Sequence, residues 1–83
     1  MHYQGKVKVR FKKSVLEPQG KAVELQLKET HHSGIREIRV GKWIDVLMDA
    51  DSDKDALDKL QKLADEVLFN PVMEVCEIEV EKV

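Results

Sequence analysis

Cysteine is nearly absent from this chain of 83 residues, since Cys76 is the only one. A single cysteine excludes an internal disulfide and a zinc site made of cysteines alone. Residues 1–13 contain no apolar run of the kind that a secretory signal needs, so we expect no signal peptide and a reduced, cytoplasmic setting. The composition likewise indicates neither a membrane-spanning segment nor a disordered tail.

Residue patterns typical of catalysis or ligand binding are equally scarce. The four glycines are isolated, so no phosphate-binding loop is present. His31 and His32 are adjacent in a polar loop, where their side chains diverge and cannot hold one metal ion together. Cys76 falls on the inward parity of a predicted strand, which favours a buried, unreactive thiol. Trp43 is the only aromatic residue placed to stack on a base, which disfavours RNA binding. We expect no catalytic residue, metal or cofactor on this chain.

The charges that are present are unevenly distributed. Residues 1–13 carry five Lys or Arg and no acid, whereas residues 51–83 carry four basic and ten acidic groups, in a chain of net charge −2. A nucleic-acid-binding protein would need one basic face, and here an acidic end can neutralise the basic one. Complementary strands within one fold therefore explain the pattern better than a phosphate-binding patch.

Apolar spacing predicts six elements in the order βαββαβ. Period-two alternation predicts strands, and apolar residues three and four apart predict helices. Ser52 suits the N-cap of the second helix, Pro71 suits its end, and Gly41-Lys42 suits a two-residue hairpin turn. The predicted elements are strands over residues 3–12, 35–40, 43–50 and 73–81, and helices over residues 18–29 and 53–68.

This order predicts an α+β fold, a ferredoxin-like two-layer sandwich with an antiparallel four-stranded sheet, in one domain spanning residues 1–83. The first helix should bury Val23 and Leu27 with Ala22 beside them. A bulge near residues 75–76 should absorb the change of parity in the last strand. That strand should pair with the first, which would set basic side chains opposite acidic ones, namely Lys6, Lys8 and Arg10 opposite Glu77, Glu79 and Glu81.

Trp43 and Leu47 fall on the sheet face that the helices are not expected to cover. Apolar side chains on an otherwise polar face are typical of a protein interface in a small domain, although Lys and Arg stems can also shield them. A small core with no disulfide or metal is commonly supported by oligomerisation. We therefore expect a homo-oligomer, a dimer or a tetramer, with Trp43 and Leu47 as self-association candidates.

Three short motifs, taken together, resemble one family. They are SVLEPQGKAV at residues 14–23, RVGK at residues 39–42 and LFNPVME at residues 68–74. In order and spacing they are similar to the PurS subunits of phosphoribosylformylglycinamidine synthase. The chain departs from that family's pattern at Glu17, where Asp is usual, and at Val75-Cys76, where an acidic residue and a tyrosine are usual.

The resemblance implies a small adaptor subunit of an ATP-dependent amidotransferase ligase in purine biosynthesis. That enzyme converts formylglycinamide ribonucleotide, ATP and glutamine into formylglycinamidine ribonucleotide. The implied partners are a large synthetase subunit, which would hold ATP and Mg²⁺, and a glutaminase subunit. The positions matching the family's motifs are the candidates for partner contact, namely Glu17, Pro18, Gln19, Gly20, Lys42, Asn70, Pro71 and Glu74.

Two other functions remain open from the residues alone. One is a ligand-sensing regulatory domain of ferredoxin-like fold that binds an amino acid at an oligomer interface. The other is nucleic-acid binding, which the net charge disfavours.

Overall fold

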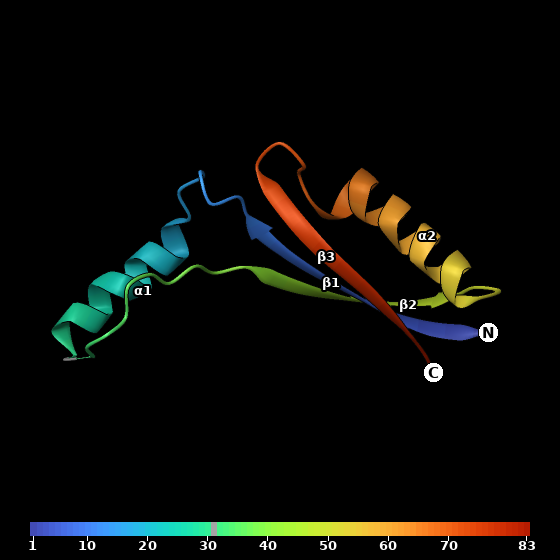
Figure 1. The fold of residues 1–83 in the computed structure, drawn as a ribbon, viewed down its shortest axis with the longest axis horizontal. Helices are drawn as coiled ribbons and strands as arrows, with labels where there is room; N and C mark the ends of the chain where they lie inside the picture. Colours follow the sequence, from blue (N-terminus) through green and yellow to red (C-terminus); the bar gives the residue numbers. More distant parts are fainter. Residues whose placement is uncertain (31) are drawn as a thin grey trace.

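The computed structural model describes residues 1–30 and 32–83, and its secondary structure follows most of the predicted boundaries (Figure 1). Pro18 starts the first helix and Ser52 caps the second, as predicted, with the Ser52 hydroxyl accepting a hydrogen bond from Asp55 N. The last turn of the second helix widens into a π-helical turn, η1. The elements are β1 (His2–Phe11), α1 (Pro18–Glu29), β2 (Lys42–Asp49), α2 (Asp53–Leu63), η1 (Ala64–Leu68) and β3 (Glu74–Lys82).

The sheet has three antiparallel strands in the order β2-β1-β3, so the predicted four-stranded sheet is wrong. The missing strand is residues 35–40, which run as extended chain beside α1 without joining a ladder. The predicted hairpin at Gly41-Lys42 is therefore also absent. A two-residue hairpin turn of this kind needs positive φ, and Gly34 is the glycine that has it, at 86°.

One face of the sheet packs against α2 and holds the core. Val7 and Val9 of β1 and Leu60 and Ala64 of the helical segment are at most 2% exposed. Gly5 lets the helix come close, because a Cβ at Gly5 would lie 2.8 Å from the Leu60 side chain. The inward residues of β2 follow the predicted parity, since Ile44, Val46 and Met48 pack on the core, and Ala50, just past the strand, is buried.

The other face carries the complementary charges that the sequence predicted. β3 pairs antiparallel with β1, which places Lys6 opposite Glu79 and Lys8 opposite Glu77. Arg10 lies opposite Val75, and its guanidinium reaches the Glu77 carboxylate diagonally at 3.0 Å. The register is continuous through residues 75–76, so the predicted bulge is absent.

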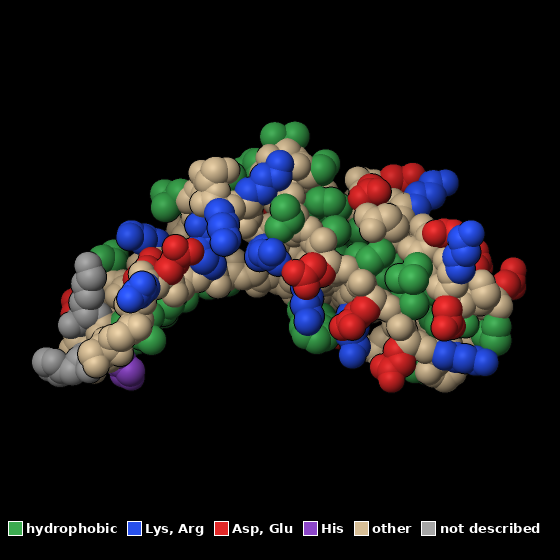
Figure 2. Space-filling view, viewed as in Figure 1, with side chains coloured by type: hydrophobic (Ala, Val, Ile, Leu, Met, Phe, Trp, Pro, Cys, Tyr) green, Lys and Arg blue, Asp and Glu red, His purple; other side chains and the backbone are tan. Residues whose placement is uncertain are grey.

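Helix α1 projects away from the sheet as an arm, which we define as residues 12–41 apart from residue 31 (Figure 1). The prediction that Val23 is buried is wrong, since its side chain is 38% exposed, and Ala22 is exposed as well. Leu25 on the same helix is 56% exposed. The Cα radius of gyration is 16.5 Å, whereas a compact domain of this length has about 12 Å. The molecule is an arch with the arm at one end and α2 at the other (Figure 2).

No helix of the described residues is long and apolar enough to cross a membrane.

Candidate functional site

A groove of about 360 Å³ lies where the arm meets the sheet. Residues of two of the three sequence motifs form its walls, and the third motif contributes one residue. Glu17, Pro18 and Gln19 form one wall at the start of α1. Lys42 and its neighbours form the second wall, and Glu74 of β3 closes the end. The full lining is Val9, Arg10, Phe11, Glu17, Pro18, Gln19, Val40, Gly41, Lys42 and Glu74.

Glu17 lines the groove but is almost fully buried, since it is only 4% exposed. One carboxylate oxygen accepts hydrogen bonds from Gly20 N at 2.6 Å and Val40 N at 2.7 Å. The other oxygen accepts from Gln19 N at 2.6 Å. Glu17 therefore caps α1 and ties the start of the helix to the returning chain.

The electrostatic surroundings keep Glu17 ionised. Burial would by itself raise the pKa of this carboxyl, but the three backbone amides and the nearby charge of Arg39 together hold its pKa below the ordinary glutamate value. The carboxylate is thus charged near neutral pH and has most of its acceptor capacity in use inside the chain.

Arg39 and Gly20 complete this junction. The Arg39 guanidinium donates to the carbonyl oxygens of Lys12 at 3.0 Å and Val15 at 2.6 Å, which fixes the loop between β1 and α1. A Cβ on Gly20 would collide with the carbonyl group of Ile38, so only glycine allows the two segments to lie this close. In the sequence, Arg39 stands out only as the first residue of the RVGK motif. Its structural role was not predictable, because the carbonyls it contacts carry no sequence signature.

The segment Asn70–Glu74 forms a tight turn that presents Glu74. The Asn70 side chain accepts from Val72 N at 3.0 Å, and the Glu74 carboxylate accepts from Asn70 N at 2.8 Å. Pro71 lies within the turn. Asn70 and Pro71 do not line the groove, so this motif reaches it only through Glu74.

Trp43 and Leu47 lie outside the groove, on the open face of the sheet. They are 54% and 78% exposed, which confirms that no element of the described chain covers them. Trp43 is partly flanked, since the Lys8 and Lys6 amino groups lie 4.9 and 5.8 Å from the ring centroid. Its indole N–H donates to the Asp45 carboxylate at 2.8 Å.

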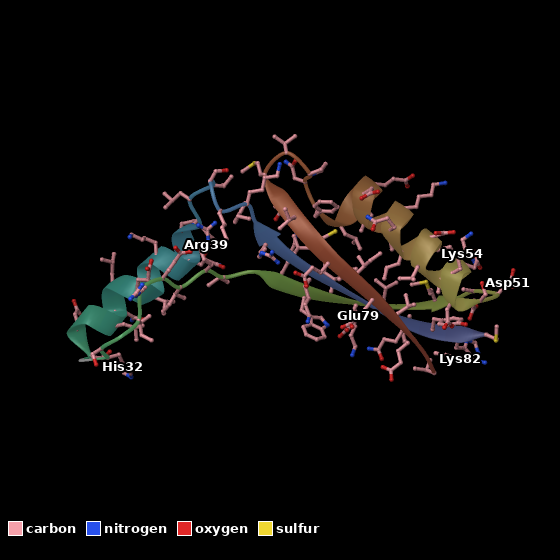
Figure 3. The ribbon with its side chains drawn as sticks, in the orientation of Figure 1. His32, Arg39, Asp51, Lys54, Glu79 and Lys82 are labelled. Carbon is pink, nitrogen blue, oxygen red and sulfur yellow. The ribbon has the colours of Figure 1, made fainter. Side chains whose placement is uncertain are left out.

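The groove offers shape and charge for binding. Among residues 1–30 and 32–83, no three His, Cys, Asp or Glu side chains come together as a metal site. Burial raises the pKa of the Cys76 thiol, and the Asp65 charge raises it further, which suits an unreactive cysteine. His32 lies at the far end of the arm, 2.9 Å from the Thr30 hydroxyl, while the expectation for His31 falls outside the described residues (Figure 3).

Comparison with known proteins gives consistent matches. The family model described as PurS, phosphoribosylformylglycinamidine (FGAM) synthase, matches residues 4–82. The PurS subunit of FGAM synthase from Bacillus subtilis is 37% identical over 98% of this chain and 95% of its own. The crystal structure of PurS from Methanocaldococcus jannaschii has a TM-score of 0.88 at 28% identity, covering 98% of both chains. A chain in the structure of PurLQS from Thermotoga maritima has a TM-score of 0.87 at 26% identity, covering 98% of this chain and 99% of that one.

Proposed function

Because the chain belongs to the PurS family and is a small subunit of FGAM synthase in purine biosynthesis, we propose that it joins the large synthetase and glutaminase subunits through the groove at the base of its arm. The observation that carries this proposal is the convergence of the Glu17–Gly20 segment, Lys42 and Glu74 around one groove. These residues are far apart in sequence, and the fold brings them together without forming a catalytic arrangement.

The groove residues divide into two roles. Pro18, Gln19 and Lys42 are exposed, and Glu74 is half-buried at the end of the groove, so these four are the proposed contacts. Glu17 and Gly20 are buried and shape the wall from inside. Asn70 and Pro71 hold the turn that presents Glu74.

Self-association is the second part of the proposal. The arm exposes Leu16, Val23, Leu25 and Ile35, and the open sheet face exposes Trp43 and Leu47. Such an amount of apolar surface on so small a chain is typical of a subunit that is covered by neighbours. We propose a dimer or tetramer in which Trp43 and Leu47 are contact residues.

The chemistry of the complex then resides on the other subunits. In this proposal ATP and Mg²⁺ bind the large synthetase subunit, glutamine is hydrolysed on the glutaminase subunit, and the assembly works in the cytoplasm. The small subunit turns over no substrate and contributes by holding its partners in position.

Reconstitution tests the proposal. The large and glutaminase subunits are mixed with and without this chain, and glutamine-dependent formation of formylglycinamidine ribonucleotide is measured. Activity should depend on the chain, and Lys42→Ala should weaken its binding to the other subunits. Lys54→Ala is the matched control, because Lys54 lies at the α2 end of the arch, far from the groove (Figure 3). Equal activity without the chain would disprove the adaptor function.

A further inference from the structure

A second hollow, of about 370 Å³, adjoins the groove, and the two share Val9, Arg10, Gly41 and Lys42 in their linings. We call it the basic pocket. Four of its lining residues are cationic and none is acidic, and Trp43 forms part of its wall. The lining is Lys8, Val9, Arg10, Arg39, Gly41, Lys42 and Trp43.

The four cationic side chains of the basic pocket differ in whether they already have an ionic or hydrogen-bond partner within the chain. Arg10 is paired with Glu77, and Arg39 donates to two backbone carbonyls. Lys8 and Lys42, by contrast, have no carboxylate within 4.0 Å among the described residues, although Lys8 lies over the Trp43 ring. Two lysines beside an exposed indole are therefore available to an external anion.

The surroundings define the kind of anion that fits. On the sheet face beside the pocket, Glu77 and Glu79 stand opposite Lys8 and Lys6, so the positive charge does not continue along a path that a nucleic acid could follow. In Figure 2 the Lys and Arg side chains gather over the arm and the adjoining end of the sheet, while most Asp and Glu lie toward α2. A short acidic segment with an apolar side chain matches both the limited charge and the indole wall.

We infer that the basic pocket binds an acidic segment of a partner subunit, with carboxylates on Lys8 and Lys42 and an apolar side chain against the part of the Trp43 indole that lines the pocket, outside the self-association contact. This inference rests on the proposed adaptor function, because it assigns a chemistry to one of the surfaces that the other subunits contact. It extends the proposed contact region from the groove to Lys8 and Trp43 on the sheet.

The test compares two charge reversals on the same strand. Lys8→Glu removes a cation that lines the pocket, whereas Lys6→Glu makes the same change two residues away, outside the lining. Both lysines face a glutamate on β3 and both lie near Trp43, so their effects on folding and on the indole are matched. Binding of each variant to the mixed large and glutaminase subunits is measured by sedimentation at about 50 and about 300 mM salt.

We expect Lys8→Glu to weaken binding about tenfold at the lower salt concentration, and Lys6→Glu to weaken it less than about threefold. The wild-type affinity should fall as salt rises, and that dependence should be shallower in Lys8→Glu. Equal effects of the two variants, or a wild-type affinity that salt leaves unchanged, would overturn the inference while leaving the adaptor function standing. A wild-type chain that binds neither subunit would end both.

Two other occupants would also overturn it. Trp43 is the only tryptophan, so its fluorescence reports on the pocket directly. Saturable quenching of the isolated chain by inorganic phosphate or ATP, abolished in Lys8→Glu, would assign the pocket to a small anion. Dissociation of the homo-oligomer in Lys8→Glu but not in Lys6→Glu would assign it to a second copy of this chain.

Discussion

Replacing Glu17 by Gln tests whether a single carboxylate fixes the direction of the arm. In the variant, the amide oxygen can take the place of the oxygen that accepts from Gly20 N and Val40 N. The amide nitrogen then occupies the position that lies 2.6 Å from Gln19 N, where two donors face each other. The variant keeps the size of the side chain and removes its charge and one acceptor.

The expected size of the effect follows from those contacts. A hydrogen bond to a charged group is stronger than a neutral one, and its loss corresponds to about a tenfold change in an equilibrium constant. We expect the amides of Gln19, Gly20 and Val40 to exchange their hydrogens about tenfold faster in the variant, because the junction opens more often. Amides in the centre of β1 should be unaffected, since α1 packs little against the sheet.

Hydrogen exchange followed by NMR makes this measurement residue by residue. Glu24→Gln is the control, because Glu24 lies on α1 and its ion pair is a 3.9 Å contact with Lys21. Unchanged exchange at Val40 in Glu17→Gln would refute the idea that the carboxylate joins the helix to the returning chain. Acceleration in both variants would point to a general loosening of the arm.

The pH dependence of the same junction has a defined sign. The pKa of Glu17 is lower in the folded chain than its ordinary value of 4.5, so the carboxylate's contribution is complete above that value. The contribution is lost as the pH falls through the lower, folded value. The Val40 amide shift should therefore titrate below the range of an ordinary glutamate, and a midpoint above 4.5 would contradict the structure.

Three further predictions concern the body of the molecule. Leu60 is fully buried, so Leu60→Ala should lower the free energy of unfolding by about 2–5 kcal/mol and the melting temperature by about 10 °C or more, measured by circular dichroism. Trp43→Lys should weaken self-association in sedimentation experiments more than it weakens folding, and equal losses would mean that Trp43 belongs to the core. Cys76 should be alkylated more slowly than glutathione at about pH 8, because its pKa is raised, and mass spectrometry reports the rate.

The parts of the fold that sequence could predict are those whose signal is local. The alternation in β1, the proline that opens α1 and the Ser52 cap each act within a few residues, and each appears as predicted. The pairing of β1 with β3 follows the usual arrangement of the predicted fold, and its register was predictable because a one-residue slip would place charges in the core.

The predicted fourth strand does not form, for a physical reason that the local sequence pattern does not reveal. Residues 35–40 alternate like a strand, but alternation does not reveal which backbone groups will accept its amide hydrogens. Val40 N donates to the Glu17 carboxylate instead of to a neighbouring strand. Gly41 follows, and it serves close approach rather than a hairpin, since a Cβ there would lie 2.5 Å from the Val9 carbonyl oxygen.

The residues of the candidate site could be selected from the sequence motifs, but the contacts that each of them makes could not. The motifs selected Glu17, Gly20 and Glu74, and the structure places them around or beside one groove. That Glu17 is buried, and that Arg39 supports the loop before it, depends on contacts between segments more than twenty residues apart. Those contacts exist only once the chain has folded.

The arm also has a consequence for the lifetime of the free subunit. A helix that stands apart from its sheet, with Leu25 more than half exposed, offers an unfolding protease an accessible starting point. Copies held in a complex would be shielded, while surplus copies would be cleared. The abundance of the small subunit would thereby follow the supply of its partners.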